Sequence, residues 1–388
     1  MIRLGVVGTG WILGAHLTAL QQLRTIRDDV VITAIATRDP ARLRGLLFGN
    51  DEGVDAVDRP AAPPIPRLSD VQPGVIPSVH ADHRELVAAG EVDALLDLTP
   101  PFRHHEVARD AIAAGLHVLT EKPLAVSVAL GRAMVEAAER AGVVLAVAEQ
   151  VRCMDRPRAE RHILASGGIG ELRLVEWPSL GSPWARSRVV AGTPWRHQRA
   201  QAGGGTGFDN GVHSIDWLRF TVGDIDSVQA VAHTFCAERG SDDGSMRVSA
   251  DVEDYVSAHL RFRNGALGHL SLSWLDDGER VLPRYVGSRA SLDGSDDLGD
   301  RLPPGALTWP GEAGELGPYA RQLLHFVRAV TGDGEPAVSA REGLADICVS
   351  LAILESALAG CWVDVEDVAS GRLREAQRSA DLVHRFDS

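Results

Sequence analysis

The first half of the chain alternates short apolar runs with segments of helical periodicity. The apolar runs lie at residues 4–7, 30–36, 94–98, 117–120 and 143–148. The segments with apolar residues at helical spacing lie at residues 14–23, 105–114 and 128–141. Strands that alternate with helices build βαβ units around a parallel sheet. The pattern therefore predicts an α/β domain with a parallel sheet over residues 1–150.

The pattern changes after about residue 150. Strand-like runs follow one another at residues 172–177, 227–235, 255–262 and 267–274. Asn264-Gly265 between the last two is a typical hairpin turn. Helical periodicity returns at residues 158–166, 212–220 and 341–359. The second half, residues 151–388, therefore reads as an α+β domain with a mostly antiparallel sheet.

One stretch interrupts the first half. Residues 58–77 contain six prolines, including the run Pro63-Pro64-Ile65-Pro66. Proline lacks the backbone N–H that a helix interior or a central strand needs. We expect a surface excursion here, and the sequence does not indicate its role.

Composition and charge indicate the number of domains, the possible partners and the localisation. A hydrophobic fraction of 45% over 388 residues is typical of a globular chain of two domains. The net charge of -14 disfavours nucleic acid and anionic membranes. No apolar run approaches the roughly 20 residues of a membrane span. Because the chain enters a strand directly at Ile2, with no leader-like segment, we expect a cytoplasmic protein.

Neither cysteines nor histidines indicate a metal site. The four cysteines, which we expect to be buried free thiols, are Cys153, Cys236, Cys348 and Cys361. His80 and His83 lie close in sequence, but no third ligand at zinc spacing accompanies them.

A glycine-rich turn follows the first strand. Gly8-Thr9-Gly10-Trp11-Ile12 stands between that strand and the first helix, where Gly8 permits a tight turn and Gly10 lets a pyrophosphate approach the backbone. Leu13 replaces the third glycine of the full fingerprint. The alternative is a tight strand–helix turn that binds no ligand.

The end of the second strand bears on the choice of cofactor. An acidic residue there accepts hydrogen bonds from the ribose 2′-hydroxyl of NAD, whereas this chain has Thr37 followed by Arg38. A hydroxyl and a guanidinium favour the 2′-phosphate of NADP. Asp39 weakens the argument, so NAD stays open as the second choice, and Arg38 read as a solvated surface charge is the alternative.

Two further segments carry candidate chemistry. Glu121-Lys122-Pro123 ends a parallel strand, at the sheet edge where ligands bind, and a lysine there can polarise a hydroxyl. Downstream, Trp195-Arg196 and Gly203-Gly204-Gly205 precede Asp209 and His213. Four residues apart on a helix, the last two share one face, where a carboxylate can orient an imidazole for proton transfer. Read alone, this pair is better interpreted as an N-cap or first-turn acid and a core histidine, but Lys122 and the glycine-rich turn reverse that interpretation.

Taken in order, these segments resemble the Gfo/Idh/MocA family of oxidoreductases over most of the chain, apart from the proline-rich stretch. The resemblance rests on Gly8-Thr9-Gly10, residues 99–104, residues 113–123, Trp195-Arg196, the triple glycine with Asp209 and His213, Val252-Glu253-Asp254 and Glu355-Ser356. Two departures are Leu13 and the segment Gln150-Val151-Arg152, which lacks an aromatic residue common at that place.

The resemblance implies a Rossmann domain joined to a domain with a large open-faced sheet, assembled as a homodimer or homotetramer. It implies hydride transfer between nicotinamide and a sugar, amino sugar or cyclitol. In this scheme Lys122 orients the reacting hydroxyl, His213 is the general acid or base, and Asp209 binds substrate and supports the histidine. The full set expected around the cofactor is Gly8, Gly10, Trp11, Ile12, Thr37, Arg38, Thr99, Pro100, His104, Glu121 and Lys122. Further substrate contacts are expected from Arg152, Trp195 and Arg196.

Two other functions fit the same residues. Some enzymes on this fold use bound NAD transiently and catalyse glycoside cleavage or epimerisation without net redox change. A sugar or dinucleotide sensor without catalysis is the third reading, and the presence of Lys122, Asp209 and His213 disfavours it.

Overall fold

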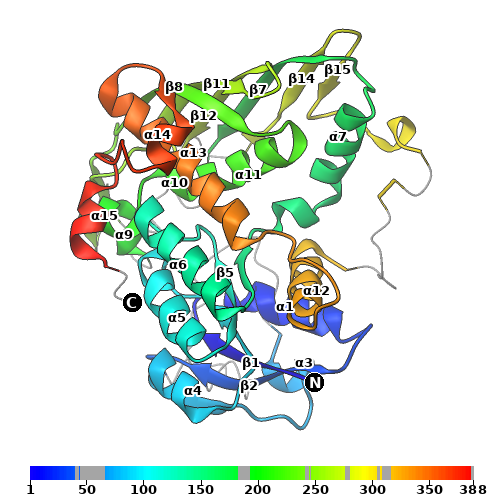
Figure 1. The fold of residues 1–388 in the computed structure, drawn as a ribbon, viewed down its shortest axis with the longest axis vertical. Helices are drawn as coiled ribbons and strands as arrows, with labels where there is room; N and C mark the ends of the chain where they lie inside the picture. The colour runs from blue at the N-terminus through cyan, green and yellow to red at the C-terminus, as the bar shows by residue number, and fades with distance from the viewer. Residues whose placement is uncertain are drawn as a thin grey trace.

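The computed structural model describes residues 1–39, 43, 66–181, 193–240, 244, 246–275, 280–303, 306–307 and 316–385. The two large sheets lie at opposite ends of the molecule, with helices between them (Figure 1). In the described part of the chain, no helix combines the length and the apolar character that crossing a bilayer requires.

The N-terminal sheet is parallel, as predicted, with strand order β3-β2-β1-β4-β5-β6. Its strands are β1 Ile2–Val7, β2 Val30–Ala36, β3 Ser78–His80, β4 Ala94–Asp97, β5 His117–Glu121 and β6 Leu145–Ala148. The long helices that connect them are α1 Leu13–Leu23, α4 His83–Ala89, α5 Pro101–Ala113 and α6 Val128–Ala141. The carboxyl ends of five of these strands lead directly into candidate site residues.

The second sheet has eight strands, seven of them in the order β15-β14-β7-β12-β11-β8-β16. Its strands are β7 Leu172–Leu180, β8 Ile225–His233, β11 Tyr255–Phe262, β12 Leu267–Ser273, β13 Arg280–Val281, β14 Arg284–Gly287, β15 Ser291–Asp293 and β16 Val363–Asp364. All neighbours run antiparallel except β12 and β7, which are parallel. The predicted hairpin at Asn264-Gly265 joins β11 to β12, with Gly265 at φ +90°.

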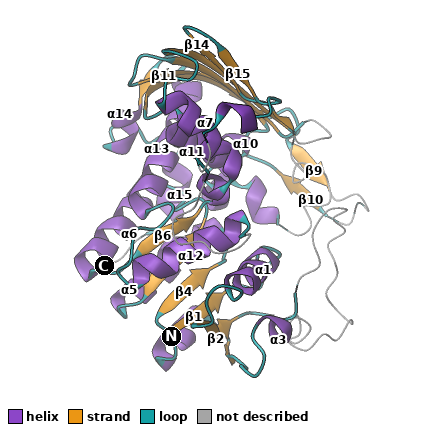
Figure 2. Ribbon diagram, turned by 90° about the vertical axis from the view of Figure 1, so that its right-hand side faces the viewer, coloured by secondary structure: helices purple, strands orange, loops and turns teal. Residues whose placement is uncertain are grey.

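In the described part of the chain, helices cover one face of this sheet, which is its inner face. They are mainly α7 Asp155–Ala165, α11 Gly211–Thr221 and α13 Ala340–Ala359 (Figure 2). Trp177 and Leu270 pack against them, whereas Leu174, Val231 and Leu267 on the outer face are 44%, 65% and 50% exposed. Among the residues that the structure describes, no helix lies on that outer face (Figure 2). The open-faced sheet predicted from the sequence is therefore present.

The remaining elements are short, apart from one helix that returns to the N-terminal half. The short ones are α3 Leu68–Val71, α9 Arg199–Ala202, α10 Thr206–Asp209, α14 Val365–Ala369, α15 Arg378–Val383, the hairpin β9 Glu238–Gly240 and β10 Arg247–Ser249, and the 3₁₀ helices Gln150–Cys153, Pro194–His197 and Gly299–Arg301. Helix α12, Pro318–Val330, packs against α1, and its Leu323 and Val327 share a core with Leu17 and Leu20. A segment that the sequence assigns to the second domain thus completes the Rossmann core.

Two predictions need correction. Residues 58–65 lie outside the described residues, but further on Leu68 and Val71 of α3 are buried, and the buried Gln72 amide bonds to both the N–H and the C=O of Ile32 at 2.8 Å. This part is packed against the sheet, because the amide side chain of Gln72 extends hydrogen bonding at β2. It is not a surface excursion.

All four cysteines are free, but only Cys153 and Cys348 are buried; Cys236 and Cys361 are exposed.

Two buried histidines should make the free energy of unfolding depend on pH. Burial, with the charges of His384 and His104, lowers the pKa of His105 from 6.5 to about 4. Burial, with the guanidinium of Arg239, lowers the pKa of His197 to about 4. Between these values the unfolded chain binds more protons than the folded one, so stability should rise with pH by at most about 1.4 kcal/mol per pH unit for each histidine.

We therefore expect the free energy of unfolding in urea to fall as pH drops from about 6.5 to about 4. Asp346, whose pKa burial raises to about 6, opposes this trend in wild type and variant alike. The His105→Gln variant should show a shallower fall than wild type. Identical pH slopes for the two proteins would contradict the assignment of a neutral buried His105.

Candidate active site

Lys122 and Asp209 meet at the carboxyl end of β5. The Lys122 Nζ atom lies 2.7 Å from the main-chain oxygen of Asp209 and 3.3 Å from its Oδ1. The Lys122–Pro123 peptide bond is cis, and the buried His104 ring holds this turn, with its nitrogens 2.9 Å from the carbonyl oxygens of Pro123 and Thr99. The structure therefore brings together two residues that stand 87 positions apart in the chain.

The Asp209 carboxylate lies between two cations. Its second oxygen forms an ion pair with Arg196, whose guanidinium also lies 4.6 Å from the ring of Trp195. Burial acts to raise the pKa of Asp209, but the charges of Arg196 and Lys122 outweigh it and hold the pKa well below its ordinary value. Asp209 is thus a fixed anion that orients both cations.

His213 is oriented by Glu149 and not by Asp209. The imidazole Nδ1 lies 2.6 Å from Oε2 of Glu149 and 2.8 Å from Oε1, and the carboxylate also accepts the N–H of Val151 at 3.2 Å. Asp209 ends α10 and His213 lies in α11, with Asn210 between the two helices, so the predicted Asp209–His213 pair on one helix face does not form. With Nδ1–H donated to the carboxylate, the Nε2 lone pair of the neutral ring can accept a proton.

Glu149 is a candidate site residue that no motif in the sequence indicated. Burial acts to raise the pKa of its carboxyl, but the charge and hydrogen bond of His213 and the ammonium of Lys122 outweigh burial, so the pKa lies below its ordinary value. Its position directly after β6, beside the strand that ends in Glu121-Lys122, is the signal that could have identified it.

The glycine turn leaves room for a dinucleotide. Gly8 has φ +100°, and a Cβ atom there would lie 2.9 Å from the carbonyl oxygen of Leu98, so only glycine fits. At Gly10, in contrast, a Cβ atom would meet nothing within 4 Å. This open space in front of the α1 N-terminus, with Trp11 39% exposed beside it, fits an approaching pyrophosphate.

Thr37 and Arg38 directly follow β2, but Thr37 is buried and Arg38 faces solvent. The buried Thr37 hydroxyl lies 2.8 Å from that of Thr9 and accepts the N–H of Asp39 at 3.1 Å. It therefore ties the glycine turn to the end of β2. Arg38 is exposed.

A third group surrounds Glu121. Its Oε1 lies 2.8 Å from Nε2 of the buried His16 on α1, and the ring of Tyr319 on α12 packs edge-on against His16 at 5.6 Å. Burial and the charge of Glu121 raise the pKa of Tyr319, so its phenol stays protonated. Neither His16 nor Tyr319 was predicted, and Tyr319 reaches this place only because α12 packs on α1.

Three further predicted residues fall in different surroundings. Thr99 donates its N–H and its hydroxyl to Asp97 at 3.1 and 2.6 Å, next to Pro100. The Trp195 ring packs against Phe102 at 6.4 Å, beside Arg196. Arg152 does not join Lys122, because Asp216 and Glu342 bind its guanidinium at 2.7 and 2.6 Å.

The triple glycine contacts protein instead of opening toward a ligand. A Cβ atom at Gly203 would lie 2.6 Å from the Phe208 ring, and one at Gly205 would lie 1.8 Å from the carbonyl oxygen of Glu253. These glycines are required by packing inside the second half of the chain. Within the described residues, no group of three or more His, Cys, Asp or Glu side chains could hold a metal ion.

Comparison with known proteins identifies the class of protein. The family model described as "Oxidoreductase family, NAD-binding Rossmann fold" matches residues 2–149. The "GFO/IDH/MocA C-terminal domain" profile matches residues 158–296. The chain is 32% identical over 289 residues to 1,5-anhydro-D-fructose reductase from Ensifer adhaerens, covering 73% of this chain and 82% of that protein. It belongs to the Gfo/Idh/MocA family and is an NAD-binding oxidoreductase.

Two further comparisons extend over more of the chain. Levoglucosan dehydrogenase from Pseudarthrobacter phenanthrenivorans is 27% identical over 330 residues, covering 75% of this chain and 84% of that protein. The solved structure of levoglucosan dehydrogenase with NADH and levoglucosan superposes with a TM-score of 0.74 at 25% identity, covering 94% of this chain and 99% of that one.

Proposed function

We propose that the protein transfers a hydride between nicotinamide and a secondary alcohol or ketone of a sugar, amino sugar or cyclitol. One observation carries the proposal: Lys122 and Glu149 directly follow the neighbouring strands β5 and β6, where Asp209 holds the Lys122 ammonium at 2.7 and 3.3 Å and Glu149 holds the His213 imidazole at 2.6 Å. An ammonium and an imidazole therefore occupy one cluster at the ligand-binding edge of a Rossmann sheet.

This cluster can handle the proton of an alcohol. Lys122, held by Asp209, stabilises negative charge on the substrate oxygen as its proton leaves. His213 accepts the proton at Nε2, and Glu149 stabilises the resulting imidazolium. The nicotinamide, when bound, accepts or supplies the hydride. In the reductive direction the same residues return the proton to the carbonyl oxygen.

The names of related proteins support the substrate class. They include 1,5-anhydro-D-fructose reductase, levoglucosan dehydrogenase and myo-inositol 2-dehydrogenase. All three names refer to compounds that carry several hydroxyl groups on a ring. The exposed apolar residues on the outer face of the second sheet support assembly as a homo-oligomer.

The proposal is tested in two steps. NAD(H) and NADP(H) are first compared by their effect on the melting temperature, because a ligand of the native state raises it. Ring polyols and their ketones are then added with the better cofactor, and absorbance of reduced nicotinamide is followed. Net conversion of cofactor supports the proposal. Substrate loss without an absorbance change would instead indicate a redox-neutral enzyme, and cofactor binding without turnover of any substrate would indicate a sensor.

We further propose that the enzyme prefers NADP to NAD, because β2 is followed by Thr37 and the exposed Arg38 in place of an acidic residue. Arg38→Asp should raise the KM for NADPH by about ten- to a hundredfold, the effect of losing one hydrogen bond to a charged group, and should change the KM for NADH little. Arg263→Asp, at an exposed arginine in the turn between β11 and β12, is the matched control. An unchanged ratio of the two KM values in Arg38→Asp would contradict NADP specificity.

A further inference from the structure

The short helix α10 connects the catalytic cluster to the second sheet. It spans only Thr206–Asp209, and Asp209 is its last residue. The first N–H groups and last C=O groups of a helix have no partners within it. For a single turn this applies to nearly every backbone group, so the position of α10 depends on what binds its two ends.

One residue binds the N-terminal end. The Glu253 Oε1 atom accepts the N–H groups of Gly205 at 2.8 Å and Gly207 at 3.1 Å, and the main-chain oxygen of Glu253 accepts the N–H of Thr206 at 3.1 Å. Three consecutive backbone donors thus bond to Glu253. Because a Cβ atom at Gly205 would lie 1.8 Å from that same carbonyl oxygen, glycine at this place permits the contact.

Lys122 binds the other end. Its ammonium donates to the main-chain oxygen of Asp209 at 2.7 Å as well as to the carboxylate. A carboxylate at the N-terminus and an ammonium at the C-terminus both match the helix dipole. The position of the Lys122 ammonium is therefore linked through four residues of backbone to the position of Glu253.

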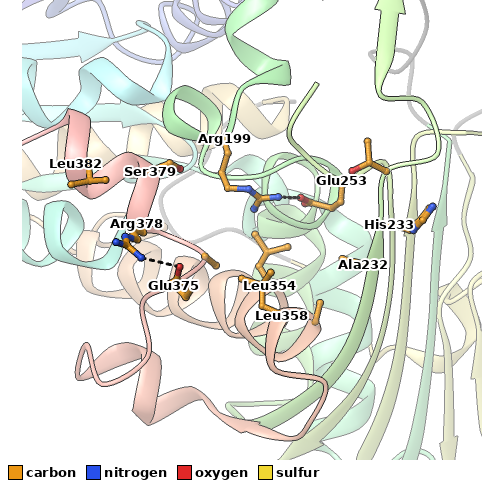
Figure 3. A pocket seen from close by; sticks show the side chains of 13 residues that line it. Arg199, Ala232, His233, Glu253, Leu354, Leu358, Glu375, Arg378, Ser379 and Leu382 are labelled. Carbon is orange, nitrogen blue, oxygen red and sulfur yellow. Dashed lines mark hydrogen bonds and ion pairs between the residues drawn. The ribbon is translucent and has the colours of Figure 1, made fainter. Parts of the chain in front are cut away.

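Glu253 is itself held from the opposite side. Its Oε2 accepts from Nη2 of Arg199 at 3.2 Å, and this nitrogen also lies 3.2 Å from the main-chain oxygen of Asp251. Figure 3 shows this ion pair in a pocket of about 560 Å³ that α15 and β8 also line. Glu253 is only 2% exposed, and these hydrogen bonds and the ion pair hold its carboxylate in place.

We propose that Glu253 is a positioning residue for hydride transfer: it sets the position of Asp209, and through Asp209 that of the Lys122 ammonium, without touching the substrate. The kinetic part of this inference rests on the proposed function. The structural part, that Glu253 orders α10, does not.

The kinetic test uses two substitutions at the same position. Glu253→Ala removes the acceptor and should lower kcat by about ten- to a hundredfold, the size expected when a reacting group is displaced by roughly an ångström. The dissociation constant of the cofactor should not change. Glu253→Gln keeps an oxygen that can accept both N–H groups but loses the ion pair with Arg199, so it should restore part of kcat.

The matched control is Glu355, a buried carboxylate on α13 that accepts the N–H of Ala376 at 2.9 Å. Glu355→Ala should cost folding stability but leave kcat within about twofold of wild type. If both alanine variants lose kcat equally, the loss reflects general destabilisation and the proposal is overturned. It is equally overturned if Glu253→Ala keeps the wild-type kcat.

Amide hydrogen exchange supplies a readout that needs no substrate. Residues 205–209 should exchange faster in Glu253→Ala than in wild type, Glu253→Gln or Glu355→Ala. Unchanged exchange there overturns the proposal whatever the kinetics. If the wild-type protein converts no polyol, the proposed function fails, and exchange at residues 205–209 alone then decides whether Glu253 orders α10.

Discussion

Replacing Lys122 by alanine is expected to lower kcat by about a thousandfold, because it removes the cation that stabilises charge on the substrate oxygen. The ammonium is held by two oxygens of Asp209, so it is fixed before substrate arrives and no reorganisation is needed during the reaction. Cofactor affinity should change little, because the glycine turn follows β1 and Thr37 and Arg38 follow β2, whereas Lys122 follows β5. Steady-state turnover and a fluorescence titration with reduced cofactor measure the two quantities.

The amino-acid composition of the chain suggests a second variant for this experiment. Lys122 is its only lysine, whereas 38 residues are arginine. Arginine therefore serves at every other basic position, and lysine at 122 indicates a need for a compact ammonium, which a planar guanidinium does not reproduce. Lys122→Arg keeps the charge and should still lose most of kcat. Wild-type turnover in Lys122→Ala would refute the catalytic assignment.

The single lysine also permits selective labelling. An amine-reactive reagent can modify only Lys122 and the N-terminus of this chain. Bound substrate with cofactor should slow labelling of Lys122 and leave labelling of the N-terminus unchanged. Equal labelling rates at Lys122 with and without ligands would place that side chain outside the binding site.

The fold was predictable because local patterns decide most of it. The β5 strand at His117–Glu121 and helix α6 at Val128–Ala141 follow from apolar periodicity and from Gly142, which ends the helix at φ +67°. Such signals lie within a few residues of the element they define. The packing of α12 against α1 had no local signal, because it depends on a contact between segments some 300 residues apart, such as Gly317 with Gln22 at 295 positions.

The site was predictable only in part for the same reason. Lys122, Asp209 and His213 lie in recognisable motifs, but the residues that they contact come from other parts of the chain. Sequence spacing suggested Asp209 as the partner of His213, whereas the order of β5 and β6 in the sheet places Glu149 there. Arg152 was misplaced because nothing in its own segment indicates the buried Asp216, which lies one helical turn beyond His213.

Replacing His213 by asparagine is expected to lower kcat by about a hundred- to ten-thousandfold, the usual contribution of a positioned general acid or base. An amide cannot accept the alcohol proton at neutral pH. The substitution also leaves the Glu149 carboxylate buried without its imidazole partner, and burial acts to raise the pKa of that carboxyl. Folding stability should therefore fall together with kcat, by about 3–5 kcal/mol in the limit of a fully buried unpaired charge.

A second substitution separates the two effects. In His213→Asn with Glu149→Gln the buried charge is gone, and two amides can hydrogen-bond to each other, so the free energy of unfolding should recover toward the wild-type value. Turnover should stay at the level of His213→Asn, because no proton acceptor has been restored. Recovery of kcat together with stability would show that His213 acts only by neutralising Glu149 and that the proton is transferred by another group. Recovery of stability alone identifies the imidazole as the acid or base and Glu149 as the residue that orients it.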